Sequence, residues 1–199
     1  MSDIVYQTGM PYQLRPDAAK LYNVAFGQKL SVAVRSEEKR ISLIQKGFIP
    51  KYAMVALSDN TLLGIAGLHT SLGSLTGGTS YKDLLCELGF FKGNWAAIIF
   101  SLYTRKPKEG ELLLDGIAVH ADSIGKGIGS RLLEEITKYA QDNKYKSVRL
   151  DVIDVNPKAK KLYERKGFKV VKTERFPYLR WLIGFSGSTT MRLSVDDPL

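Results

Sequence analysis

Residues 124–130 combine three glycines with a lysine, a composition that suits the binding of phosphate groups. In order they are Ile124, Gly125, Lys126, Gly127, Ile128, Gly129 and Ser130. Glycine lets the backbone approach a ligand closely and adopt dihedral angles that other residues avoid. The segment opens an amphipathic helix expected over residues 128–140, whose first N–H groups lack intrahelical partners and lie at the positive end of the helix dipole. The pattern predicts an anion site, and a pyrophosphate is the ligand that it suits best.

Two widespread phosphate-binding motifs fit this segment less well. The segment lacks the Gly-Lys-Ser/Thr ending of a P-loop. The strand expected over residues 111–119 ends several residues too early for a dinucleotide-binding turn, although Asp151 keeps that alternative open as the acidic residue such a fold places on the ribose. A glycine-rich connection that binds nothing is the structural alternative.

A second segment, residues 156–168, has the signals of a helix with defined ends. Asn156 suits the N-cap and Pro157 the first helical position. Gly167 suits the left-handed position after the last turn, with Phe168 packing back as its hydrophobic partner. Much of this segment is therefore accounted for by helix construction alone.

The order and spacing of the two segments resemble the GNAT superfamily of acetyltransferases. The first is similar to the family motif Gln/Arg-x-x-Gly-x-Gly/Ala, with Ile124 in the place of Gln or Arg, which removes one polar side chain. The second matches Asn-x-x-Ala-x-x-Leu-Tyr-x-x-x-Gly-Phe at every quoted position. With the strand that precedes the glycines, the resemblance spans residues 111–168.

The resemblance implies roles for particular residues. Backbone groups of Ile117, Ala118 and Val119 are expected to pair with the pantetheine arm of coenzyme A, much as an added strand does. The backbone amides expected to hold its pyrophosphate are those of Gly125, Lys126, Gly127, Ile128, Gly129 and Ser130. Tyr163 is expected to protonate the departing thiolate and Asn156 to contact the cofactor. The structural alternative is that Tyr163 only packs in the core and Asn156 only caps its helix.

The general base is less clearly marked than the acid. Asp115 lies on the expected central strand and is the candidate base, and Asp151 and Asp154 lie on the neighbouring strand. His120 follows the central strand as a candidate proton relay, and His69 is a candidate to face the acceptor cleft. Two separated histidines and one cysteine offer no metal-binding cluster, so no metal is expected.

The expected fold is an α/β (α+β) fold of the GNAT type. Strand, helix, strand, helix and strand follow one another from residue 111 onwards, which implies at least one parallel crossover. The resemblance implies a mixed, mostly antiparallel central sheet flanked by helices, with the parallel β-α-β crossover at the cofactor site. We expect a single acetyltransferase domain over residues 1–199, with an apolar helical insert at about residues 81–103.

Two segments are too apolar for exposed loops. Residues 81–103 are expected to be helical with a break near Gly93, and they either pack on the domain, cover the acceptor site or form a homodimer contact. Residues 176–185 are expected to act similarly from the other side. Cys86, among apolar neighbours, is expected to be a small buried hydrophobe.

The expected function is transfer of an acetyl group from acetyl-CoA, as co-substrate, to a primary amine of a small molecule, by direct attack in a ternary complex. A protein or peptide N-acetyltransferase and a non-catalytic acyl-CoA-binding module are the alternatives. The net charge of +9 attracts anions. Nucleic acid is not an expected partner, because the basic residues are scattered and form no stripe interleaved with aromatics.

The N-terminal residues show no basic stretch followed by an apolar one, so no signal peptide is expected. The most apolar stretch, residues 88–103, is interrupted and too short to span a bilayer. A single cysteine suits a reducing compartment. We therefore expect a cytoplasmic protein without a membrane partner.

Overall fold

The helices and strands follow the hydrophobic pattern of the chain, and the computed structural model describes residues 3–195 of it. The strands are β1 (Val5–Thr8), β2 (Ala53–Ser58), β3 (Thr61–Thr70), β4 (Gly73–Ser74), β5 (Glu111–Val119), β6 (Ser147–Ile153), β7 (Lys169–Arg175) and β8 (Gly187–Ser194). The helices are α1 (Arg15–Leu30), α2 (Glu37–Gly47), α3 (Tyr81–Leu88), α4 (Phe90–Tyr103), α5 (Ile128–Asp142), α6 (Pro157–Arg165) and α7 (Arg180–Ile183).

Within residues 3–195 the strands form one eight-stranded sheet in the order β1-β2-β3-β5-β6-β8-β7, with β4 paired to β3. β5 and β6 run parallel and are joined through α5, and the other neighbouring strands are antiparallel. The mixed, mostly antiparallel sheet with a parallel crossover is therefore confirmed. The turn between β2 and β3 places Asp59 and Asn60 at φ of 46° and 63°, which suits a tight hairpin.

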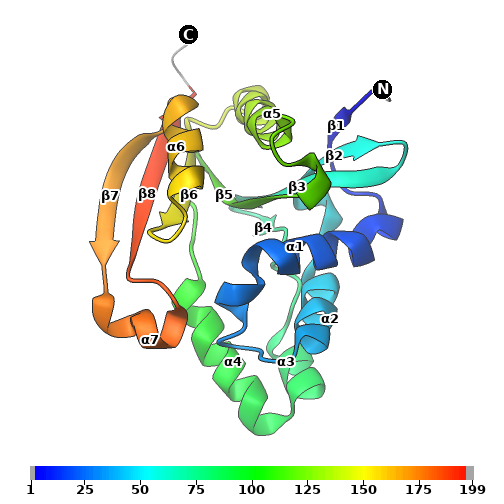
Figure 1. The fold of residues 1–199 in the computed structure, drawn as a ribbon, viewed down its shortest axis with the longest axis vertical. Helices are drawn as coiled ribbons and strands as arrows, with labels where there is room; N and C mark the ends of the chain where they lie inside the picture. Colours follow the sequence, from blue (N-terminus) through cyan, green and yellow to red (C-terminus); the bar gives the residue numbers. More distant parts are fainter. Residues whose placement is uncertain (1–2, 196–199) are drawn as a thin grey trace.

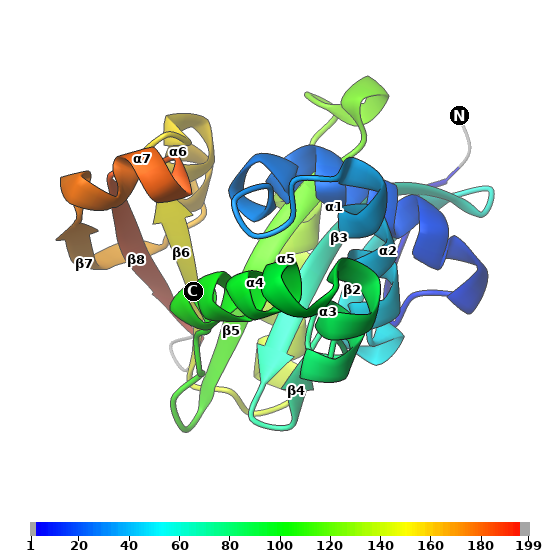
Figure 2. The same cartoon turned by 90° about the horizontal axis from the view of Figure 1, so that it is seen from below.

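The sheet opens between its two central strands. β5 pairs with β6 from Glu111 as far as Leu114, which lies opposite Leu150, and no pairing of β5 with β6 follows in the described part of the chain. Beyond that point β5 remains bonded to β3, and β6 remains bonded to β8. Figure 1 shows β6, β7 and β8 with α6 and α7 on one side of this opening and β1–β5 with α1 and α2 on the other. α3 and α4 lie at the lower end of the molecule in Figure 1 and therefore in front of the strands in Figure 2, which is seen from below.

A β-bulge lies at the start of the opening. Gly67 of β3 pairs with Gly116, and the next residue, Leu68, pairs with Leu114, so Asp115 is the extra residue of β5. Bulges bend a strand and redirect its side chains, and they occur often beside active sites. Gly116 is required here because a Cβ at this position would collide with the ring of Phe26 on α1. The end of α1 therefore packs directly over the point where the two strands separate.

The main core lies between the sheet and the helices on its faces. α5 buries a regular apolar face against β2, β3 and β5. Its buried members are Ile128, Leu132, Leu133, Ile136 and Ala140, the face that the sequence predicts. A separate apolar cluster joins α3 and α4 to α2 and to the segment between α1 and α2. Among the described residues, no helix is both long and apolar enough to cross a bilayer.

Two local predictions need correction. The break in residues 81–103 falls at Gly89, whose φ is 79°, and not near Gly93, which lies inside α4. Cys86 is exposed and not buried. α3 is an amphipathic helix that buries Leu84, and a residue two positions further along faces roughly the opposite side.

Candidate functional site

Residues 124–130, called the glycine loop from here on, lead into the start of α5 as predicted. Gly127 is the N-cap with a φ of 80°, and Gly125 has a φ of 84°, both in the left-handed region that favours glycine. Within residues 3–195, five backbone amides of the loop and first turn have no hydrogen-bond partner. They belong to Gly125, Gly127, Ile128, Gly129 and Ser130. These free donors at a helix N-terminus are a ready site for a diphosphate.

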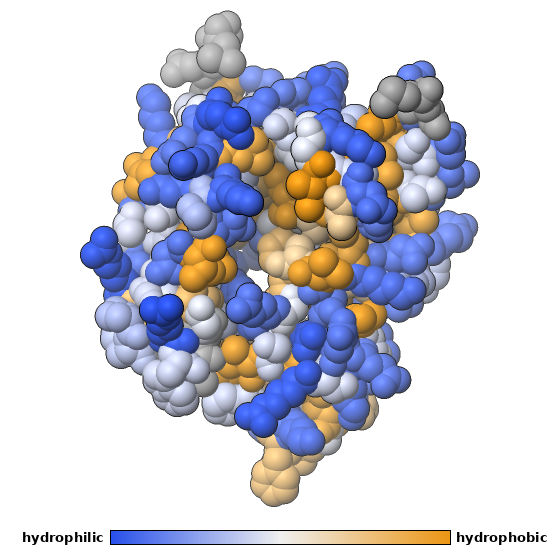
Figure 3. Space-filling view, viewed as in Figure 1, coloured by the Kyte–Doolittle hydropathy of each residue, from blue (hydrophilic) through white to orange (hydrophobic). Residues whose placement is uncertain are grey.

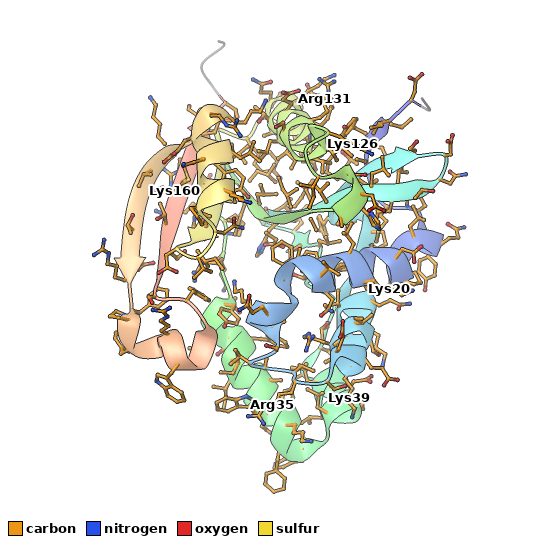
Figure 4. All side chains as sticks on the ribbon, viewed as in Figure 1. Lys20, Arg35, Lys39, Lys126, Arg131 and Lys160 are labelled. Carbon is orange, nitrogen blue, oxygen red and sulfur yellow. The ribbon has the colours of Figure 1, made fainter. Side chains whose placement is uncertain are left out.

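One predicted amide is not available in this way. The backbone N–H of Lys126 bonds the Ser123 carbonyl oxygen at 3.3 Å, because the loop closes a turn there. Lys126 is exposed and contributes its side-chain charge instead. Figure 4 shows Lys126 and Arg131 beside the start of α5 and Lys160 on α6 across the opening. Arg131 is held by Glu134 and Glu135 at 3.1 and 2.7 Å, so its charge is partly neutralised.

The free edge of β5 offers further backbone groups. The amide of His120 bonds the Leu63 carbonyl oxygen on β3 at 2.8 Å. In an antiparallel pair the N–H and C=O groups of successive residues point to alternate sides. Ala118 therefore faces β3, whereas Ile117 and Val119 present their N–H and C=O groups to the opening. Two of the three residues predicted to contact pantetheine can thus pair with an extended ligand, and Ala118 cannot do so with its backbone.

α6 adjoins the glycine loop and is built as predicted. The side chain of Asn156 caps it by accepting a hydrogen bond from the Ala159 amide at 3.1 Å. At the other end Gly167 has a φ of 85°, and the Phe168 amide bonds the Tyr163 carbonyl oxygen at 3.0 Å. Leu162 lies 4.0 Å from where a Cβ on Gly129 would be. α6 therefore lies beside the first turn of α5.

Tyr163 is almost completely buried, with 9% of its surface exposed. Its ring packs against that of Phe168, with 5.9 Å between the ring centroids. Its hydroxyl makes no hydrogen bond to the described residues. Burial raises the pKa of Tyr163 to about 12, so the phenol remains protonated throughout the neutral range. A buried phenol that keeps its proton can act as a donor to a nearby thiolate.

A cavity of about 580 Å³ lies where β5 and β6 separate, and both strands line it. Its walls come from α1–α4, from β3, β5, β6 and β8, and from the segments that precede α3, β5 and β8. Neither Tyr163 nor Asn156 lines it. Figure 3 shows a hollow between the two halves of the molecule with apolar residues around it. A cavity of this size suits a small organic ligand.

The cavity contains a histidine–carboxylate pair. His69 Nδ1 lies 3.3 Å from Asp115 Oδ1, and both side chains are largely buried. The second oxygen, Asp115 Oδ2, is buried and has no partner among the described residues. The bulge in β5 turns Asp115 toward His69, which pairs with Leu113 across the two strands. In this arrangement the carboxylate can orient the imidazole and stabilise it when it takes up a proton.

The other acidic and histidine candidates have different surroundings. Asp151 lines the cavity but is held by Arg105 and Arg149 at 3.1 and 3.2 Å. Asp154 accepts hydrogen bonds from the Ser186 amide, outside the cavity. His120 is half exposed and lies 3.6 Å from the exposed Asp122. Among the predicted candidates, the structure therefore brings together His69 and Asp115. Sequence reasoning did not pair them because 46 residues separate them in the chain.

Comparison with known proteins agrees with this arrangement. A profile of the Acetyltransferase (GNAT) family matches residues 18–168, which include the glycine loop, α5 and α6. No match was found among curated proteins. Within the described residues, no group of three or more His, Cys, Asp or Glu side chains is placed to hold a metal ion.

Solved structures with the same fold are numerous. An N-acetyltransferase from Staphylococcus aureus Mu50 superimposes with a TM-score of 0.65 at 16% identity, covering 95% of this chain and 100% of that one. The structure of yncA from Salmonella typhimurium with its cofactor acetyl-CoA has a TM-score of 0.59 at 14% identity, covering 98% and 95%. The apo form of an agmatine N-acetyltransferase mutant has a TM-score of 0.62 at 15% identity, covering 96% and 99%. The family profile covers most of the chain, and the chain therefore belongs to the Acetyltransferase (GNAT) family.

Proposed function

We propose that this protein is an acetyl-CoA-dependent N-acetyltransferase that acetylates a primary amine of a small molecule by direct attack in a ternary complex. The observation that carries the proposal is the position of the His69–Asp115 pair. It lies in the 580 Å³ cavity at the point where β5 and β6 separate, and the glycine loop follows the far end of β5. A nucleophile in the cavity and a thioester along the free edge of β5 would meet there.

The residues on the cofactor side fit acetyl-CoA. The free amides of Gly125, Gly127 and Ile128–Ser130 match a diphosphate, and Lys126 adds a charge for a phosphate group. Ile117 and Val119 offer the pairing groups of an unpaired strand edge to the pantetheine arm. The N–H of Val119 would polarise the thioester carbonyl. The related structure of yncA contains acetyl-CoA, which supports the same co-substrate for this chain.

Two groups of the chain would move the protons. The imidazole of His69 would accept a proton from the acceptor amine, with Asp115 holding the ring and stabilising its charged form. The phenol of Tyr163 would donate its proton to the sulfur of the departing coenzyme A. The new C–N bond forms as the C–S bond breaks, so one proton is taken up by the chain and one is released from it. Asn156 contributes by capping α6 and is proposed as a cofactor contact.

The form of the cavity supports a small acceptor. α3 and α4 contribute Tyr81, Leu84 and Phe100 to its wall, opposite β5. A protein or peptide acceptor needs an open groove, whereas α3 and α4 form part of the wall of this cavity. The related agmatine N-acetyltransferase, by its name, acts on a small amine. Residues 81–103 are therefore proposed to cover the acceptor site with their inner face.

The experiment is an acceptor screen with acetyl-CoA, in which released thiol is detected and the product is identified by mass spectrometry. The panel contains small amines, amino acids and peptides with free N-termini. We expect thiol release that depends on a small acceptor and equals the amount of acetylated product. Turnover of peptides without turnover of small acceptors would contradict the small-molecule assignment. Binding of acetyl-CoA with no turnover of any acceptor would instead indicate a binding module.

A further inference from the structure

The acceptor cavity contains an ammonium group with no carboxylate of its own. Lys29, near the end of α1, lines the cavity, and no carboxylate of the described residues lies within ion-pair distance of its nitrogen. The nitrogen instead lies 4.4 Å from the ring centroid of Tyr103 and 5.9 Å from that of Phe185. Burial lowers the pKa of Lys29, the nearby charge of Arg105 lowers it further, and Asp151 and Asp115 oppose this effect. The cation is thus poorly compensated by its surroundings.

A network of charged side chains extends away from the cavity wall, where Arg105 and Asp151 line it. Arg149 bridges Glu111 and Asp151, Arg192 also contacts Glu111, and Arg105 contacts Asp151. Three guanidinium groups therefore share two carboxylates in this network. Thr190 donates a further hydrogen bond to Asp151, which leaves that carboxylate fully engaged. Within the described residues, the two carboxylates of this network pair with guanidinium groups and form no ion pair with Lys29.

A second polar group near Lys29 lacks a partner. The hydroxyl of Tyr103 is buried and makes no hydrogen bond to the described residues. Its ring is the one beneath the Lys29 ammonium, and it stacks on Phe185 with 6.5 Å between centroids. Buried polar groups are nearly always satisfied, so an unpaired hydroxyl in a cavity wall indicates a ligand group at that position. An ammonium and a phenol side by side are both hydrogen-bond donors and suit an anion.

We propose that the acceptor is an amino acid with an apolar side chain, whose carboxylate binds Lys29 and the Tyr103 hydroxyl while its amine reaches His69. This rests on the proposed function and names its substrate class. The remaining walls supply apolar surface, with Tyr22, Phe26 and Phe185 among them. A diamine or guanidinium-bearing amine places a second cation beside Lys29 and Arg105, and like charges in a poorly solvated cavity repel strongly. Acceptors of that kind are therefore disfavoured.

The experiment compares acceptors that differ in the carboxylate alone. Phenylalanine is matched with phenethylamine and leucine with isoamylamine, and agmatine is the cationic control. We expect kcat/KM for each amino acid to exceed that of its decarboxylated partner by about tenfold or more, because a charged hydrogen bond is lost with the carboxylate. Equal or higher values for the decarboxylated amines would overturn the proposal.

Two variants locate the effect. Lys29→Met keeps the length of the side chain and is expected to lower kcat/KM for the amino acids by about 10- to 100-fold, with less than about a threefold change for the amines. Lys20→Met, on the exposed side of the same helix, is the matched control and is expected to change neither. Tyr103→Phe, which removes one hydroxyl, is expected to lower kcat/KM for the amino acids selectively, and by a smaller factor than Lys29→Met. A uniform loss for both acceptor types in Lys29→Met would contradict the assignment.

Calorimetric titration of the same ligands into the protein with coenzyme A separates this inference from the proposed function. Preferential binding of the amino acids that is lost in Lys29→Met supports the carboxylate site, whether or not turnover occurs. Absence of thiol release with every acceptor, despite such binding, contradicts the acetyltransferase activity alone. Absence of any amino-acid preference in binding overturns the carboxylate site alone.

Discussion

Tyr163→Phe is expected to lower kcat by about 10²–10⁴-fold, the usual value of a positioned proton donor. The affinity for acetyl-CoA is expected to change by less than about threefold, because the hydroxyl acts when negative charge develops on the sulfur and not in the ground state. The fold is expected to tolerate the change, since the ring keeps its packing against Phe168. Kinetics with the best acceptor measure kcat, and calorimetry measures the affinity for acetyl-CoA.

The matched control for this variant is Tyr139→Phe on α5, whose ring packs against Tyr145 and does not line the cavity. This control variant also lacks one phenolic hydroxyl, but Tyr139 has no role in the proposed reaction. If Tyr163→Phe kept the full kcat, Tyr163 would only pack in the core, which is the structural alternative given for it above. If both kcat and acetyl-CoA affinity fell together, its role would be in cofactor binding.

His69→Ala is expected to lower kcat/KM for the acceptor by about 10²–10⁴-fold, because the imidazole proposed to take the amine proton is removed. Asp115→Asn is expected to have a smaller effect, since the imidazole remains but loses the carboxylate that orients it. Acetyl-CoA affinity is expected to be unchanged in both variants. Steady-state kinetics across pH provide the test, since a good external base is expected to restore part of the rate to His69→Ala.

His120→Ala is the matched histidine control. His120 is half exposed at the end of β5 and lies outside the cavity, so its loss is expected to leave the rate near that of the wild type. Equal losses in the two alanine variants would point to a general effect on β5 and not to a base in the cavity. Full activity of His69→Ala would remove the His69–Asp115 pair from the mechanism.

Most of the cofactor side could be predicted because its signals are local. The start of α5 at Ile128 and the cap of α6 at Asn156 follow from residues a few positions apart. β5 has the predicted bounds because apolar residues occupy it almost without interruption. The single domain over residues 1–199 and the contacts of the individual site residues with a ligand stay predictions.

The acceptor side could not be predicted to the same degree because its contacts are not local. The His69–Asp115 pair depends on a bulge in the pairing of β3 with β5, which no short pattern specifies. Lys29 has the sequence context of a solvated lysine at a helix end, and the rings that lie beside it, Tyr103 and Phe185, come from distant segments. α7 has four residues and lies within the apolar segment 176–185, which carries no helical period.

The apolar composition of residues 81–103 alone could not distinguish packing on the domain, a cover over the acceptor site and a homodimer contact, because these residues have both a buried and an exposed apolar face. Phe91 and Ile98 of α4 are exposed, whereas Ala97 and Phe100 line the cavity. The predicted cover over the acceptor site thus fits the inner face. A homodimer contact through the outer face stays a prediction.

The proposed binding of the diphosphate of acetyl-CoA by free backbone amides is tested most directly at Gly129. Proline there removes one unpaired N–H without breaking a helix bond, because the first turn has no intrahelical acceptor for it. Gly129→Ala also adds a Cβ, 3.7 Å from Val119, but keeps the N–H. Calorimetry is expected to show about 10-fold or greater loss of acetyl-CoA affinity in Gly129→Pro and near wild-type affinity in Gly129→Ala. Equal affinity in the wild type and both variants would contradict the account.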